Sequence, residues 1–225
     1  MSNVLVAEHL TRRLPGEVPV TLVEDVSLEI PHGEFVAIRG PSGSGKSSLL
    51  YLLGLLDRPT TGRILLDGED TSGYDEDRLA DVRLKKLGFV FQFHFLLAEF
   101  TALENVMMPM RRLGSLSSNE QRARALALLK DLGLEGHEQK HPSQLSGGMR
   151  QRVAIARALA NDPLIILADE PTGALDTKSS ENVRTILHDL AHDQRRCIIA
   201  VSHDIAFASG ADRQIEIVDG RLRTS

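Results

Sequence analysis

The most informative stretch of the sequence is Gly40-Pro41-Ser42-Gly43-Ser44-Gly45-Lys46-Ser47. It matches the pattern G-x-x-x-x-G-K-[ST] between a short apolar run, Phe35–Ile38, and a stretch with the spacing of a buried helix. Small residues allow successive backbone N–H groups to point into one concavity, where the start of a helix adds positive potential. We expect Lys46 to reach the β- and γ-phosphates, Ser47 to ligate Mg²⁺ and Ser48 to be a further contact. A merely flexible Gly/Ser loop is the alternative, but the full motif and its flanks favour a nucleoside triphosphate site.

Two carboxylates, Asp169 and Glu170, directly follow the apolar run Leu164–Ala168, which is typical of a buried strand. An Asp at the carboxyl end of such a strand, beside a phosphate loop, can hold the Mg²⁺ shell. Glu170 is then placed to polarise a water for attack on the γ-phosphate. Many strands end in polar residues, so the pair is ambiguous alone, but together with the phosphate loop it predicts a hydrolytic site.

Strand-like and helix-like stretches alternate along the chain, which predicts an α/β fold, and the phosphate loop within it indicates a phosphate-loop NTPase core. We expect a helix over Ser47–Leu56. Expected strands are Val23–Ile30, Phe35–Ile38, Ile64–Leu66, Leu87–Phe91, Leu164–Ala168, Cys197–Val201 and Ile215–Val218. Between about 93 and 160 the apolar residues recur at three and four spacings, as in Gln121–Leu132 and Val153–Leu159. This stretch is expected to be an inserted set of helices punctuated by Pro109, Gly114, Gly133 and Pro142.

Length and composition indicate one globular domain, 1–225, with a net charge of −5 and 25% charged residues. The mild acidity disfavours a nucleic-acid binder. The single Cys197 fits a reducing compartment. Met1–Thr11 does not resemble a signal peptide, and the apolar runs are far shorter than the roughly 18 residues that span a bilayer. We therefore expect membrane spans, if the function requires them, to belong to another polypeptide.

A second candidate for a phosphate-binding helix start is Leu145-Ser146-Gly147-Gly148-Met149, where a hydroxyl and two glycines precede a helix. With this stretch the sequence resembles the ATP-binding subunit of ABC transporters, whose signature motif it matches. The resemblance covers essentially the whole chain, with the motifs in the family's order. It implies a core of ABC ATPase type, a helical subdomain at roughly 93–160 and an antiparallel β subdomain near the N-terminus.

The resemblance also implies a head-to-tail homodimer in which Ser146, Gly147 and Gly148 contact the γ-phosphate of ATP on the partner's phosphate loop. Gln92 matches the family's Q-loop glutamine, which binds Mg²⁺ and couples to the membrane partner. Asp176, in Ala174-Leu175-Asp176, matches the D-loop at the dimer interface, and His203 matches the switch histidine of the catalytic site. The other histidines, including His94, His137 and His141, are expected at the surface.

Two positions depart from the family pattern. Met149 stands where Gln or Glu is usual, so the subunit contact is expected to differ while ATP binding survives. Leu14 falls near the place of an aromatic residue that stacks on adenine, and an aliphatic side chain covers a base with less stacking gain. Base selectivity is therefore expected to be loose.

Within the family, the segments Gly88–Gln92, Glu104–Val106 and Leu167–Asp176 look most like the lipoprotein-release and macrolide-export group. The resemblance implies an ATP-hydrolysing subunit with ATP and Mg²⁺, at the cytoplasmic face of a membrane, that drives a separate permease chain. An alternative is a soluble ABC-type ATPase acting on nucleic acid or ribosomes; a small-molecule kinase or an inactive cassette fits the motifs less well. An apolar run after Gln92 is either core packing or a docking surface: Phe93, Phe95, Leu96, Leu97 and Phe100.

Overall fold

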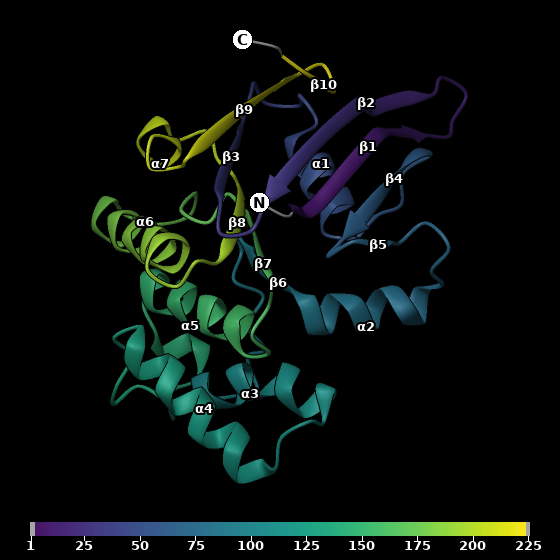
Figure 1. Cartoon of the computed structure of the whole chain (residues 1–225). Coiled ribbons are helices and arrows are strands. Elements are labelled where there is room, and N and C mark those ends of the chain that lie inside the picture. The colour runs from purple at the N-terminus through teal and green to yellow at the C-terminus, as the bar shows by residue number, and fades with distance from the viewer. Residues whose placement is uncertain (1–2, 224–225) are drawn as a thin grey trace.

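The computed structural model of the chain describes residues 3–223 and contains two sheets (Figure 1). The antiparallel sheet has the order β2-β1-β4-β5. Its strands are β1 (Asn3–Leu14), β2 (Val20–Pro31), β4 (Thr61–Leu66) and β5 (Glu69–Asp70). The larger sheet has the order β10-β9-β3-β8-β7-β6, parallel except for β10. Its strands are β3 (Phe35–Arg39), β6 (Leu87–Phe91), β7 (Ile165–Asp169), β8 (Cys197–Val201), β9 (Arg213–Val218) and β10 (Arg221–Leu222).

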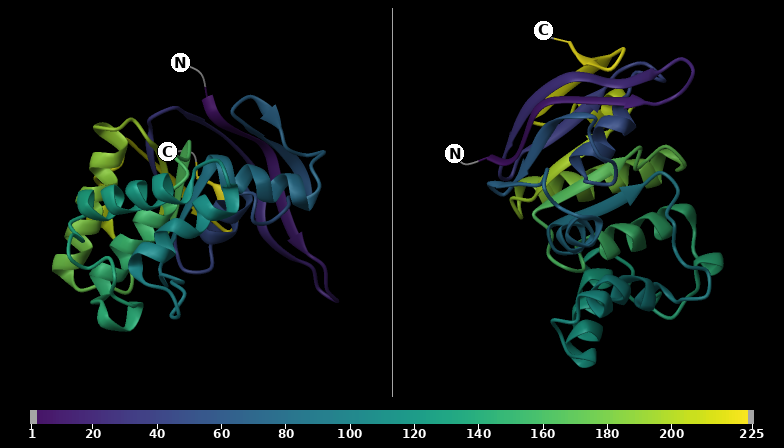
Figure 2. Two further views of the ribbon diagram at one scale, coloured as in Figure 1. Left: turned by 90° about the horizontal axis from the view of Figure 1, so that it is seen from below. Right: turned by 90° about the vertical axis from the view of Figure 1, so that its right-hand side faces the viewer.

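Helices lie between the strands in the sequence. They are α1 (Lys46–Leu53), α2 (Glu76–Lys86), α3 (Ala102–Leu113), α4 (Ser118–Asp131), the short 3-10 helix η1 (Pro142–Gln144), α5 (Gly147–Leu159), α6 (Thr177–His192) and α7 (Ile205–Ala208). Of these, α3, α4 and α5 form a lobe below the parallel sheet in Figure 1. Figure 2 shows α3 and α4 at the end of the molecule away from the antiparallel sheet. Capping boxes start both helices: Thr101 with Glu104, and Ser117 with Glu120.

The two faces of the parallel sheet pack against different helices, because successive side chains of a strand point to opposite faces. Ile166 and Ala168 of β7 belong to a core that includes residues of α3, α4, α5 and α6. Ile165 and Leu167 belong to a second core, with residues of α1, α2 and the antiparallel sheet. Helices α1 and α5 therefore cover opposite faces of one sheet.

The α/β class and the expected strands are confirmed, and the differences have local causes. Helix α1 ends at Leu53 instead of Leu56, because Gly54 caps it and Leu55 adopts a positive φ of 57°. Helix α3 continues through Pro109, which was expected to punctuate the chain, and its capping box and buried face outweigh the proline penalty. Helices α3, α4, α5 and η1 fall within 93–160. The division into subdomains at those limits stays a prediction.

Candidate nucleotide-binding and hydrolysis site

The phosphate loop connects β3 to α1, and its glycines have conformations that other residues rarely adopt. Gly40, Gly43 and Gly45 have φ values of 150°, 77° and 98°. A Cβ atom on Gly40 would lie 2.1 Å from the carbonyl oxygen of Ile217, and one on Gly45 would lie 2.2 Å from that of Leu22. The loop thus follows this path only with glycine at the two positions where neighbouring backbones approach it.

The start of α1 is suited to phosphate. Its N-cap is Gly45, which has no side chain to cover the first N–H groups, and no acidic residue occupies the first turn. Lys46 Nζ donates to the carbonyl oxygens of Gly40 (3.0 Å) and Pro41 (2.7 Å), so its charge lies over the loop. Ser42 is exposed and Ser48 half-buried. The hydroxyl of Ser44 is buried and has no hydrogen-bond partner among the described residues.

Oxygen ligands for a divalent cation meet where α1 faces the carboxyl end of β7. Ser47 Oγ donates to Asp169 Oδ1 at 2.9 Å. Because Mg²⁺ prefers hydroxyl and carboxylate oxygens, these residues fit that ion. Gln92 follows β6, whose last residue, Phe91, is in register with Asp169. The side chain of Gln92 lies against Gly173, where an added Cβ would be 3.0 Å from Gln92 Nε2.

Tyr51 is a site residue that sequence reasoning missed. Its hydroxyl donates to Asp169 Oδ2 at 2.8 Å. Burial and the hydrogen bond to Asp169 raise the pKa of Tyr51 to about 12. The available signal was its position four residues after Ser47, which places both side chains on one face of α1.

Glu170 and His203 lie together after the neighbouring strands β7 and β8. His203 Nδ1 is 2.9 Å from Glu170 Oε2, with the Glu170 side chain 17% exposed and the His203 side chain 73% exposed. Glu170 has a positive φ of 47°, and its N–H donates to Val201 O at 3.0 Å. A strained, tethered residue directly after a strand is a common feature of functional sites. The pair combines a carboxylate that can accept a proton with an exposed imidazole that can reach a ligand.

The stretch from Ser146 to Gly148 lies on the other side of the sheet from the phosphate loop, at the start of α5. Ser146 caps this helix by accepting a bond from Met149 N at 3.3 Å. Gly148 packs against α6, where a Cβ would lie 2.5 Å from Ser179 Oγ. Asp176 caps α6 and accepts bonds from Ser179 N (2.9 Å) and Oγ (2.8 Å), which lower the pKa of Asp176. The structure thus joins these residues to one another and separates them from α1.

The expectation that His94 lies at the surface is wrong. It is half-buried, with Nε2 3.1 Å from the carbonyl oxygen of Gly147, and burial lowers its pKa. Arg157 of α5 donates to the carbonyl oxygens of His94 (2.8 Å) and Phe95 (2.7 Å), and so holds this loop on the helix. His137 is also half-buried, because its loop folds back on the helical lobe, while His141 is exposed.

The apolar run after Gln92 divides between the two expected roles. Leu96 packs against the core, whereas Phe93 and Phe95 are each 64% exposed. Phe91 stacks on Phe89 and meets Phe95 edge-on. Phe89 and Phe91 line a groove of about 470 Å³ bordered by α2, α3 and α5.

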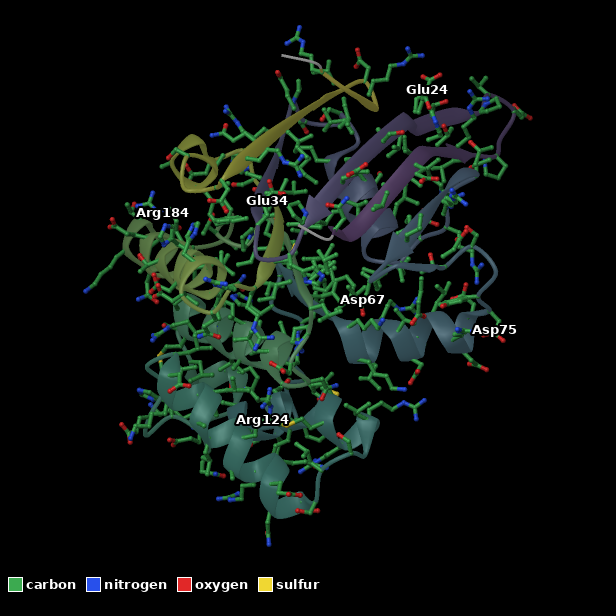
Figure 3. The ribbon with its side chains drawn as sticks, viewed as in Figure 1. Glu24, Glu34, Asp67, Asp75, Arg124 and Arg184 are labelled. Atoms are coloured by element: carbon green, nitrogen blue, oxygen red, sulfur yellow. The ribbon has the colours of Figure 1, made fainter. Side chains whose placement is uncertain are left out.

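Met149 and Leu14, the two positions that depart from the family pattern, differ in their surroundings. Met149, in the first turn of α5, packs against the core. Leu14 ends β1 and is 38% exposed. The charged residues labelled in Figure 3 lie on different parts of the molecule: Glu24, Glu34, Asp67, Asp75, Arg124 and Arg184.

Fold and site together define a phosphate-loop nucleotide-binding protein of the α/β class. The family model "ABC transporter" matches residues 23–173. The chain is 51% identical over 223 residues to a lipoprotein-releasing system ATP-binding protein, LolD 1, of Chlorobium chlorochromatii, covering 98% of this chain and 91% of that protein. It is 49% identical to the macrolide export ATP-binding/permease protein MacB of Mannheimia succiniciproducens, covering 98% of this chain and 34% of that protein.

A solved structure supports the same assignment. The dimeric ATP-binding cassette MJ0796 in a post-hydrolysis state, bound to ADP and Pi, matches with a TM-score of 0.90 and 44% identity. The match covers 98% of this chain and 97% of that one. The chain belongs to the ABC transporter family. It is an ATP-binding and ATP-hydrolysing cassette, and the family favours a transport ATPase over an ATPase directed to nucleic acid. Within residues 3–223, none of the helices has the length and apolar character of a membrane span.

Proposed function

We propose that this chain works as one of two identical ATPase subunits, which close on Mg-ATP and drive a membrane-spanning permease from the cytoplasmic face. The lipoprotein-release and macrolide-export group is the proposed subgroup. In support, two relatives at about 50% identity are named for lipoprotein release and for macrolide export. The printed name of the second joins an ATP-binding part to a permease, which supports a permease as the partner here.

The observation that carries the proposal is the placement of α1 and α5 on opposite faces of the sheet. Ser146 caps α5 and Gly147 begins it, on the face of the sheet opposite α1, so they cannot serve the nucleotide held by the loop before α1 of the same chain. A second copy in head-to-tail orientation would bring the start of its α5 to this loop. The dimeric form of the cassette MJ0796, at 44% identity, supports this arrangement.

In the proposed mechanism the phosphate loop and Lys46 bind the phosphates, and Ser47, Asp169 and Gln92 hold Mg²⁺. The ion, when bound, neutralises charge on the β- and γ-phosphate oxygens. Glu170 accepts a proton from the attacking water, and His203 holds the carboxylate through the 2.9 Å contact. Because the γ-phosphate is gripped by both copies, its loss removes the stabilisation of the closed dimer, and the population shifts to the open state.

The proposed docking site for the permease is the groove between α2, β6, α3 and α5. Its walls are mostly apolar, with Leu56, Phe89 and Met108 among them. Arg112, which is exposed, also lines the groove and would provide a polar anchor. The groove adjoins the loop that starts at Gln92, so a segment seated there would sense the position of that loop.

The direct test of the split site uses Glu170→Gln, which keeps the size of the side chain but removes the proton acceptor. This variant is expected to bind Mg-ATP, to lose turnover and to accumulate as a dimer in light scattering. Ser146→Arg in the same background should return the protein to a monomer, because it places a bulky cation in the shared interface. A Glu170→Gln protein that stays monomeric with saturating ATP, also with its membrane partner present, would rule out the proposal.

A further inference from the structure

A tyrosine outside the recognised motifs contacts the carboxylate of the proposed metal site. Tyr51 lies on α1 one helical turn after Ser47, and both hydroxyls face the end of β7. Ser47 Oγ donates to Oδ1 of Asp169 at 2.9 Å, and Tyr51 Oη donates to Oδ2 at 2.8 Å. Each carboxylate oxygen is therefore held by a separate hydroxyl from the same helix.

We propose that Tyr51 is a positioning residue for the divalent-cation site. This inference rests on the proposed role of Ser47 and Asp169 as Mg²⁺ ligands. A cation bound by Ser47 and by Oδ1 of Asp169 would leave the hydrogen bond from Tyr51 to Oδ2 intact. Tyr51 then fixes the rotation of the carboxylate and so presents Oδ1 to the ion, as partners of metal ligands commonly do.

The surroundings of Tyr51 favour a fixed donor over a mobile one. The ring is half-buried and packs against the core formed by α1 and the antiparallel sheet. Among residues 3–223, Ser47 and Tyr51 are the residues whose side chains donate to Asp169. Removing the Tyr51 hydroxyl thus leaves Oδ2 without its side-chain donor.

The chain supplies its own spectroscopic probe, since it has two tyrosines and no tryptophan. The second, Tyr74, is also half-buried against the same core, and it donates to Glu69 Oε2 at 2.7 Å outside the nucleotide site. Tyr74→Phe leaves Tyr51 as the one emitter. The fluorescence of a tyrosine is quenched when its hydroxyl is hydrogen-bonded to a free carboxylate. Mg-ADP is therefore expected to raise the emission of Tyr51, as the cation draws charge from Asp169. Asp169→Asn in the same background should remove the response.

The matched pair Tyr51→Phe and Tyr74→Phe then separates positioning from packing, because each variant loses one hydroxyl bonded to a carboxylate. We expect Tyr51→Phe to raise the Mg²⁺ concentration for half-maximal ATPase activity about tenfold. Calorimetric titration of Mg²⁺ into the ADP complex should show the same shift. KM for ATP at saturating Mg²⁺ should stay at the parent value, and Tyr74→Phe should match the parent throughout.

The inference about Tyr51 is overturned if Tyr51→Phe keeps the parent Mg²⁺ dependence, or if the emission of Tyr51 does not respond to Mg-ADP while Asp169→Asn abolishes Mg²⁺ binding. If Asp169→Asn itself leaves Mg²⁺ binding unchanged, the proposed metal site fails, and the inference fails with it. The fluorescence experiment keeps the Tyr51 hydroxyl in place, so it decides the matter even if Tyr51→Phe does not fold.

Discussion

At the scale of single residues, close backbone contacts and a positive φ together decide which glycines of the phosphate loop can be replaced. Gly43 and Gly45 both have positive φ, but a Cβ on Gly43 meets nothing within 4 Å, whereas one on Gly45 meets a backbone oxygen at 2.2 Å. Gly43→Ala should lower the free energy of unfolding by about 1 kcal/mol, from backbone strain alone. Gly45→Ala should lower it by about 3 kcal/mol or more, because the loop must also shift. Urea denaturation compares the two, and equal losses would contradict the argument.

At the scale of elements, α5 ties the Ser146–Gly148 stretch to the ends of β6 and β7. The buried side chain of Gln151 donates to the carbonyl oxygens of Phe91 (3.2 Å) and Pro171 (2.8 Å), which adjoin Gln92 and Glu170. Gln151→Met keeps the volume and removes both donors, so we expect a loss of about 1–3 kcal/mol of stability. The loops that carry Gln92 and Glu170, the residues proposed to act on Mg²⁺ and water, then loosen. We therefore expect kcat to fall by a larger factor than the change in KM for ATP.

The matched control for Gln151→Met is Gln121→Met, on α4. Gln121 is also buried, but its amide donates to Leu116 O at 2.8 Å within the helical lobe. A similar stability loss with an unchanged kcat is expected. If steady-state kinetics show the same fall in kcat for both variants, the link through α5 is not specific.

The same elements explain how much could be predicted from the sequence. The position of Asp169 and Glu170 at the end of a strand could be predicted because a continuous apolar run precedes them, and the α/β core could be predicted from several such runs. Helix α2 was missed because it buries only Leu79 and so has no apolar stripe. Tyr51 and His94 were missed for a different reason: their partners are 118 and 53 positions away, and only the packed sheet and α5 bring them together.

At the scale of the whole molecule, the groove between α2, β6, α3 and α5 is the proposed link between ATP hydrolysis and a membrane partner, and a substitution of Leu56 tests it. Leu56 is 44% exposed and lines the groove, so Leu56→Glu should leave the fold and the basal ATPase rate unchanged. A charge in an apolar groove should nevertheless prevent docking. Val18→Glu is the matched control, because Val18 is 80% exposed at the tip between β1 and β2, away from the groove.

The measurement is affinity purification of tagged chains from detergent-solubilised native membranes with Mg-ATP, in the Glu170→Gln background. A multi-span protein should accompany the parent and Val18→Glu in stoichiometric amount. The Leu56→Glu chain should recover at least about tenfold less of it, since a tenfold loss corresponds to about 1.4 kcal/mol and docking must take the new carboxylate out of water. Equal recovery with all three chains would place the permease contact elsewhere on the surface. Recovery of nucleic acid or ribosomes in place of a membrane protein would refute the transport coupling itself, because the groove would then serve a soluble partner.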